Sequence, residues 1–323
     1  MNVARLGAHA PGRMYRVIVA AFPGQGSQTP GFLIPWLESA DARERLERYS
    51  EAAGVDLVAA GTEWDADQIR DTSVAQPLIV AASILAWRQL SDAERASFGG
   101  VAGHSVGEIA ALIAANVISD IDGMRLVGAR GRAMAEAAAL AETGMSAVVG
   151  GKEPEVLEAI AAAGVAPANF NGGGQIVAAG ALDGLAALAE NPPRGVRVIA
   201  LQVAGAFHTA YMSSASEALQ AAVDDICLVQ DPALPLWTNS DGSVVTSGSR
   251  ALELIVHQVQ NPVRWDLCME SFAGAGITGL VEFTPAGALT GLAKRGLRGT
   301  PAVALKTPDD LAAMGDLLAA TAH

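Results

Sequence analysis

Charged, aromatic and cysteine residues are all scarce in this 323-residue chain. Charged residues make up 17% and aromatic residues 5%, whereas hydrophobic residues reach 51%. So much apolar sequence argues against disorder and is ample for a sizeable buried core. Acidic residues outnumber basic ones, 34 to 21, for a net charge of −13. We therefore expect no nucleic-acid partner, because contacts with phosphates need clustered Lys and Arg.

The two cysteines, Cys227 and Cys268, form no CxxC pair, and no His/Cys cluster has the spacing of a zinc site. We expect both to be reduced, with no disulfide framework and no metal. The longest apolar stretches, such as 77–87, are too short to span a membrane. Residues 1–13 lack an apolar signal core and are interpreted as a tail, and Met14 is an alternative start. These features predict a cytoplasmic protein that does not enter a membrane.

The hydrophobic pattern predicts an α/β fold. A β-branched strand at 15–22 runs into a glycine-rich loop, and a second strand and turn at 99–107 leads into a helix at 108–117. Another apolar helix is expected to extend to about residue 90, with Pro77 in its first turn. A buried strand followed by such a loop is typical of a parallel sheet.

In residues 144–203 the order of predicted elements changes to the β-α-β-β-α-β order of a ferredoxin-like unit. We predict a hydrolase-like core with a parallel sheet and an inserted small ferredoxin-like subdomain. The expected divisions are a tail (1–13), a large α/β catalytic subdomain (14–142 and 204–323) and the small subdomain (143–203).

The stretch GHSVG, from Gly103 to Gly107, lies between the second strand and its helix. Gly-x-Ser-x-Gly in this context describes a nucleophile elbow, in which the serine occupies a strained turn at a helix N-terminus. Ser105 is the candidate nucleophile, and the backbone N–H of Val106 is the expected oxyanion donor. The alternative is a structural glycine-rich turn with a capping serine.

A serine nucleophile needs a base, and the best-placed histidine is His208, which follows the last strand of the inserted unit. His257, in a helix-like stretch, is the other candidate. Arg130 lies on the apolar face of a helix predicted for 120–135, where a guanidinium needs a partner. That partner could be a structural carboxylate or the carboxylate of a substrate, and periodicity leaves both open.

Seven stretches, in order along the chain, resemble malonyl-CoA:acyl-carrier-protein transacylases and the related acyltransferase domains of polyketide synthases. They are FPGQGSQ (22–28), TSVAQPL (72–78), GHSVGE (103–108), the arginine 25 positions after the serine, NFNGGGQIVAAG (169–180), AFH (206–208) and NPVRW (261–265).

The resemblance implies roles for individual residues. Ser105 matches the acylated nucleophile, His208 the base and Arg130 the group that holds the malonyl carboxylate. The other matches are Gln25 near the oxyanion hole, Gln76 in the same pocket, Gln258 as the source of the backbone carbonyl that orients the histidine, Phe207 as a selectivity residue, and Asn169 and Asn171 near the cleft.

The implied reaction is a ping-pong transfer from malonyl-CoA to the phosphopantetheine thiol of an acyl carrier protein. The chain would need no cofactor of its own and is expected to act as a monomer. Fatty acid synthesis is the expected pathway, and a stand-alone acyltransferase of a polyketide assembly line is the alternative. A serine thioesterase or acyl hydrolase is a further alternative, but it would not need Arg130.

Overall fold

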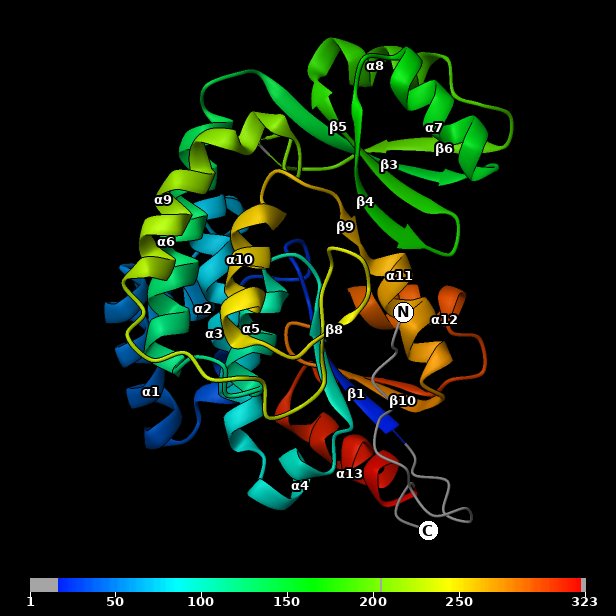
Figure 1. Cartoon of the computed structure of the whole chain (residues 1–323). Coiled ribbons are helices and arrows are strands. Elements are labelled where there is room, and N and C mark those ends of the chain that lie inside the picture. The colour runs from blue at the N-terminus through cyan, green and yellow to red at the C-terminus, as the bar shows by residue number, and fades with distance from the viewer. Residues whose placement is uncertain (1–16, 204, 321–323) are drawn as a thin grey trace.

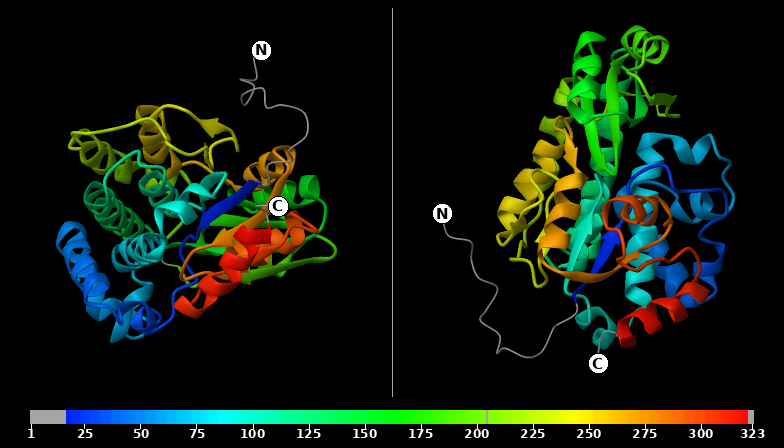
Figure 2. Two further views of the ribbon diagram at one scale, coloured as in Figure 1. Left: turned by 90° about the horizontal axis from the view of Figure 1, so that it is seen from below. Right: turned by 90° about the vertical axis from the view of Figure 1, so that its right-hand side faces the viewer.

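A computed structural model describes residues 17–203 and 205–320, so the predicted tail and the alternative start at Met14 lie outside the described residues. The chain forms two sheets, and one lies above the other in the view of Figure 1. Helices surround the lower sheet, and two helices cover one side of the upper sheet (Figures 1 and 2).

The larger sheet has the strand order β11-β10-β1-β2-β7-β8, and only its last pair, β7 with β8, is antiparallel. The strands are β1 (Val17–Phe22), β2 (Gly100–Gly103), β7 (Leu236–Trp237), β8 (Val244–Val245), β10 (Ile277–Glu282) and β11 (Ala302–Ala304).

Both faces of this sheet are buried. Along β1, Ile18, Ala20 and Phe22 join one apolar cluster, whereas Val19 and Ala21 join another on the opposite face. The first cluster also takes in residues of α1 (Ala40–Ala53), α3 (Thr72–Gln89), α5 (Gly107–Ala114), α6 (Asp120–Ala138), α9 (Ser213–Asp224) and α10 (Gly248–Gln258). The second takes in α11 (Trp265–Gly274) and α12 (Ala288–Gly296). Burial on both faces explains why the strands read as continuous apolar runs.

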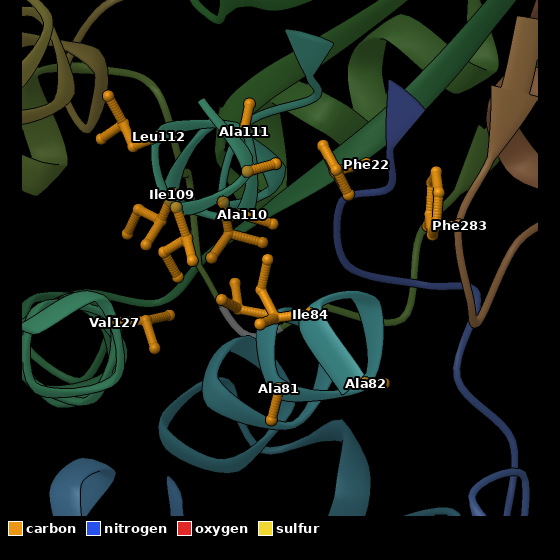
Figure 3. Close-up of a cluster of buried hydrophobic side chains, with 14 of the residues drawn as sticks. Phe22, Ala81, Ala82, Ile84, Ile109, Ala110, Ala111, Leu112, Val127 and Phe283 are labelled. Carbon is orange, nitrogen blue, oxygen red and sulfur yellow. The ribbon is translucent and has the colours of Figure 1, made fainter. Parts of the chain in front are cut away.

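Helices α3 and α5 pack against each other in the first cluster, with Ile84 of α3 and Ile109 and Ala110 of α5 between them (Figure 3). The prediction that Pro77 lies in the first turn of α3 is wrong. The side chain of Asp71 accepts a hydrogen bond from the Ser73 N–H and caps the helix, which begins at Thr72. Pro77 therefore lies inside it. Helix α5 is likewise shorter than predicted and ends at Ala114, just before Asn116 with φ 58°.

The second sheet has the order β6-β3-β5-β4-β9. Its elements β3 (Thr143–Gly150), α7 (Glu153–Ala162), β4 (Ala166–Gly172), β5 (Gln175–Ala181), α8 (Leu182–Glu190) and β6 (Val196–Ala200) follow the predicted β-α-β-β-α-β order. The predicted fold class is confirmed. β9 (Val263–Arg264) pairs with β4 and comes from a distant part of the sequence. The subdomain boundaries stay a prediction.

The remaining helices are short or peripheral. They are α2 (Leu57–Thr62), α4 (Asp92–Ala96), α13 (Leu311–Ala320) and the 3₁₀ turns Ile34–Leu37, Gln68–Arg70, Ala210–Met212 and Pro308–Asp310.

The turn from β2 into α5 leaves no space for side chains at its two glycines. A Cβ at Gly107 would lie 2.2 Å from the carbonyl oxygen of Phe22, and one at Gly103 would lie 1.9 Å from the carbonyl carbon of Gly107. In both cases the obstacle is backbone, which cannot move aside as a flexible side chain can. These glycines let α5 begin directly against the end of β1.

We therefore expect Gly107→Ala to lower the free energy of unfolding by about 3 kcal/mol, at the upper end for overpacking. Urea unfolding at pH 7 measures it. Gly291→Ala is the matched control, because no heavy atom lies within 4 Å of a Cβ there. That helical substitution should be neutral or stabilise by up to about 1 kcal/mol. Equal effects of the two substitutions would contradict the account of the turn.

Candidate active site

Ser105 occupies the turn between β2 and α5 with φ 51°, a left-handed conformation that is uncommon outside glycine. Asn239 fixes this turn from the end of β7. Its side-chain oxygen accepts the Ser105 N–H at 2.7 Å, and its Nδ2 donates to the Gly103 carbonyl at 2.8 Å. The strain is thus held by hydrogen bonds at both ends of the turn, as expected for a functional conformation.

His208 meets Ser105 from a segment that follows the small sheet. Its Nε2 lies 2.8 Å from Ser105 Oγ, and its Nδ1 lies 2.8 Å from the carbonyl oxygen of Gln258. A carbonyl can only accept, so Nδ1 carries the proton and the lone pair of Nε2 faces the hydroxyl. His208 has φ 61°, and its own N–H donates to the Val259 carbonyl at 3.0 Å. The pair has the geometry of a nucleophile and its general base.

Burial and, to a smaller extent, the positive charge of Arg130 lower the pKa of His208 from 6.5 to about 3. The imidazole is therefore neutral at neutral pH and free to accept a proton. The other candidate base, His257, lies on α10 and lines a separate hollow of about 400 Å³ that includes neither Ser105 nor His208. The structure thus brings His208, and not His257, to the serine.

Arg130 reaches the dyad from α6, with 1% of its surface exposed. One terminal nitrogen donates to Gln76 Oε1 at 2.6 Å, and the other donates to Gln258 Oε1 at 2.8 Å and lies 3.3 Å from Ser105 Oγ. Among the described residues no carboxylate pairs with it directly, and its Nε has no hydrogen-bond partner. Burial lowers the pKa of Arg130 to about 10, so it stays a cation at neutral pH. The structural carboxylate considered as its partner is not found.

Glu108 acts on Arg130 electrostatically, although the amide of Gln258 separates the two side chains. Glu108 Oε1 accepts the Asn239 N–H at 2.7 Å, and its Oε2 accepts from Gln258 Nε2. Burial raises the pKa of Glu108 to about 7, against the opposing effects of these hydrogen bonds and of Arg130.

A cleft of about 160 Å³ contains the dyad. Eight of the ten predicted site residues line it: Gln25, Gln76, Ser105, Val106, Asn169, Asn171, Phe207 and His208. The other two, Arg130 and Gln258, are buried behind it in contact with Ser105. Residues associated with both sheets therefore meet at one cleft. Its volume suits an acyl group of a few atoms.

Individual lining residues have distinct settings. Gln25 Nε2 donates to the Arg70 carbonyl at 3.4 Å, and Asn171 Oδ1 lies 2.9 Å from His104 Nε2. Within the described residues, the Val106 N–H donates to no backbone or side-chain acceptor, so it is free to meet an oxyanion. Gly205, three residues before His208, has no space for a side chain, because a Cβ there would lie 2.6 Å from that of Ala138.

Two residues of this network were not predicted, namely Glu108 and Asn239. Glu108 gave a signal, since it is a charged residue in an otherwise apolar helix and needs buried partners. Asn239 gave a weaker one, as a polar residue two positions after a two-residue strand. Its neighbours in space are far away in sequence.

The described part of the chain has no group of three or more His, Cys, Asp or Glu side chains placed to hold a metal ion. Within residues 17–203 and 205–320, no helix has the length and hydropathy that crossing a membrane requires. Cys227 is exposed, Cys268 is buried, and both are free thiols.

Comparison with known proteins gives a consistent result. The family model described as acyl transferase domain matches residues 19–310. The malonyl CoA-acyl carrier protein transacylase of Mycobacterium tuberculosis (strain ATCC 25618 / H37Rv) is 49% identical over 305 residues, which cover 93% of this chain and 100% of that protein.

Two solved structures are also similar. The crystal structure of MCAT from Mycobacterium tuberculosis superposes with a TM-score of 0.90 at 48% identity, covering 94% of this chain and 100% of that one. A malonyl-transacylase in complex with its type II PKS acyl-carrier protein gives a TM-score of 0.86 at 30% identity, covering 92% and 98%.

The low pKa of His208 predicts that its ring stays neutral, with the proton on Nδ1, down to about pH 5. Unfolding frees the ring to take up a proton below about pH 6.5, so its contribution to the free energy of unfolding falls as the pH is lowered from there toward 3. Nitrogen-15 NMR of the imidazoles shows whether each ring is neutral or protonated at a given pH. The exposed ring of His257 serves as an internal comparison. Titration of His208 near pH 6.5 would contradict the geometry.

Proposed function

This chain belongs to the acyl transferase family, as its motifs predict, and from that premise we propose that it moves the malonyl group of malonyl-CoA through Ser105 to the phosphopantetheine thiol of an acyl carrier protein. The observation that carries the proposal is the buried guanidinium of Arg130, 3.3 Å from the hydroxyl of Ser105 and bonded only to neutral oxygens. A malonyl ester on Ser105 has a free carboxylate one methylene beyond its carbonyl. A planar guanidinium fork binds such a group through two parallel hydrogen bonds.

In the first half-reaction, His208 Nε2 takes the proton of Ser105 as Oγ attacks the thioester carbonyl. The developing oxyanion is stabilised by the free N–H of Val106, with Gln25 beside it in the cleft. The tetrahedral intermediate collapses as the carbon–sulfur bond breaks. The departing CoA sulfur receives the proton from His208, which leaves malonyl-Ser105 and neutral histidine.

In the second half-reaction, the carrier thiol gives its proton to His208 and attacks the serine ester. The carbon–oxygen bond to Ser105 breaks, and Oγ recovers its proton from His208. Throughout, the carbonyl of Gln258 holds Nδ1–H, so the imidazolium that forms transiently keeps its orientation. No carboxylate is needed behind the base.

Selectivity within the cleft involves Phe207, a lining residue directly before His208. Its aromatic ring would crowd an α-methyl branch on the malonyl group. A single methyl group changes binding by about 1–3 kcal/mol, so we propose a preference for malonyl over methylmalonyl substrates and not an absolute exclusion. Asn169 and Asn171 line the same cleft and are proposed to contact the substrate.

We propose fatty acid synthesis as the pathway and the cytoplasm as the location, with the chain acting as a monomer. The likeness to a malonyl-transacylase solved with a type II PKS carrier protein favours a polyketide assembly line as the second candidate. Transfer rates to purified carrier proteins of the two kinds distinguish these pathways.

Mixing the protein with malonyl-CoA alone should give a persistent adduct of one malonyl group on Ser105, seen by intact-mass spectrometry and peptide mapping. Ser105→Ala should give no adduct and no transfer, because the nucleophile is gone. Rapid release of free malonate without an adduct would instead support the hydrolase alternative.

Arg130→Ala should lower kcat/KM for malonyl-CoA on the order of 10²- to 10³-fold, because losing one partner of a buried charge pair costs about 2–5 kcal/mol. Steady-state kinetics measures the loss. Arg125→Ala is the control, since Arg125 lies on the same helix but is exposed and pairs with Asp122 at the surface. If both variants kept wild-type kcat/KM, carboxylate recognition by Arg130 would be refuted.

A further inference from the structure

Glu108 contacts residues that support the site but does not line the cleft. It lies in the first turn of α5, is 5% exposed and is not a lining residue. One carboxylate oxygen holds the backbone N–H of Asn239 and the other holds the side-chain amide of Gln258. The chemistry proposed above does not use this group.

The amide of Gln258 has acceptors on one side and a cation on the other. Its Nε2 faces Glu108 and the Ser105 carbonyl, the latter at 3.2 Å, while its Oε1 faces the guanidinium of Arg130 at 2.8 Å. If the amide were turned over, its oxygen would meet two acceptors and its NH₂ group would meet a cation. Only one orientation satisfies all of these partners.

We propose that Glu108 is a positioning residue for recognition of the acyl carboxylate: it holds the Gln258 amide so that the amide oxygen fixes the Arg130 guanidinium beside Ser105. This inference rests on the proposed function, in which Arg130 binds the malonyl carboxylate.

The indirect arrangement has a physical consequence. A direct Glu–Arg pair would occupy the guanidinium fork and neutralise it, and a substrate carboxylate would then compete with a fixed negative charge. With Gln258 between them, the carboxylate form of Glu108 supports the buried cation from a distance. Among the described residues the fork meets only neutral oxygens, those of Gln76, Gln258 and Ser105. A carboxylate can displace neutral oxygens, because its negative charge attracts the guanidinium more strongly than an amide dipole does, and the low dielectric of a buried site strengthens that attraction.

A purely structural role for Glu108 predicts a different behaviour. Through Asn239 the carboxylate also supports the turn of Ser105. If that support were its main role, removing the charge would slow every reaction of Ser105 by a similar factor, whether or not the reagent carries a carboxylate.

The test compares two acylating reagents on Glu108→Gln. Rapid quench with mass spectrometry gives the rate of Ser105 acylation by malonyl-CoA, and labelling by diisopropyl fluorophosphate, a neutral reagent, reports on Ser105 and His208 alone. We expect the malonyl-CoA rate to fall about 10- to 100-fold and the rate with the neutral reagent to change less than about threefold.

Glu282→Gln is the matched control. Glu282 is also fully buried and accepts three backbone N–H groups, from Gly287, Leu289 and Thr290, but it does not contact the site. Its substitution should lower stability and leave the ratio of the two rates unchanged. Gln258→Ala, which keeps the backbone carbonyl that orients His208, should reproduce the split of Glu108→Gln and serves if the latter does not fold.

Equal losses with both reagents, or no loss with either, would overturn the positioning role. Failure of the proposed function gives a different result: wild-type protein would react with diisopropyl fluorophosphate but form no malonyl adduct.

Discussion

The guanidinium of Arg130 is a buried positive charge with no directly paired carboxylate in the described part of the chain, and much of the site is arranged around it. Placing such a charge away from water is costly unless its hydrogen bonds are met. Here α3 supplies Gln76, α10 supplies Gln258 and α5 supplies Glu108 one step further away. An unneutralised cation in a place of low dielectric is a strong and preorganised receptor for an anion. Burial lowers the pKa of His208 most, and the same charge adds to that effect, so that the base stays neutral.

Gln258 connects this receptor to the base. Its backbone oxygen orients His208, and its side-chain oxygen holds Arg130. In a Ser-His-Asp triad a carboxylate would take the first role. A carboxylate placed beside His208 would also attract the guanidinium and weaken its hold on the substrate. A neutral carbonyl orients the imidazole without adding a competing charge, which accounts for a dyad where the substrate itself is an anion.

Sequence reasoning found the parts of the site that have local signatures. The glycines around Ser105 are required by the close approach of backbone at Gly103 and Gly107. The helical period placed Arg130 on an apolar face, but it could not say whether its partner was a protein carboxylate or a substrate. Nor did the residues alone decide between His208 and His257. The choice depends on which distant segment of the chain lies beside Ser105. The family resemblance pointed to His208, and the structure places His208 there.

What was missed depends on long-range contacts. Strands β7 and β8 have two residues each, too few for a period to be read, yet the end of β7 brings in Asn239. Strand β9 joins the second sheet from beyond the inserted unit. Pro77 was placed in the first turn of α3 by its usual preference, whereas the cap at Asp71 starts the helix at Thr72 and leaves Pro77 inside it. Glu108 was within a quoted motif, but its partners come from α10 and from the end of β7.

The most direct test of the central claim is a crystal structure of the protein trapped with malonyl on Ser105. The account predicts that the malonyl carboxylate lies on the Arg130 fork, having displaced at least one of the two glutamine oxygens, while His208 still donates from Nδ1 to the Gln258 carbonyl. A carboxylate that points to solvent, with both glutamine contacts to Arg130 intact, would contradict it.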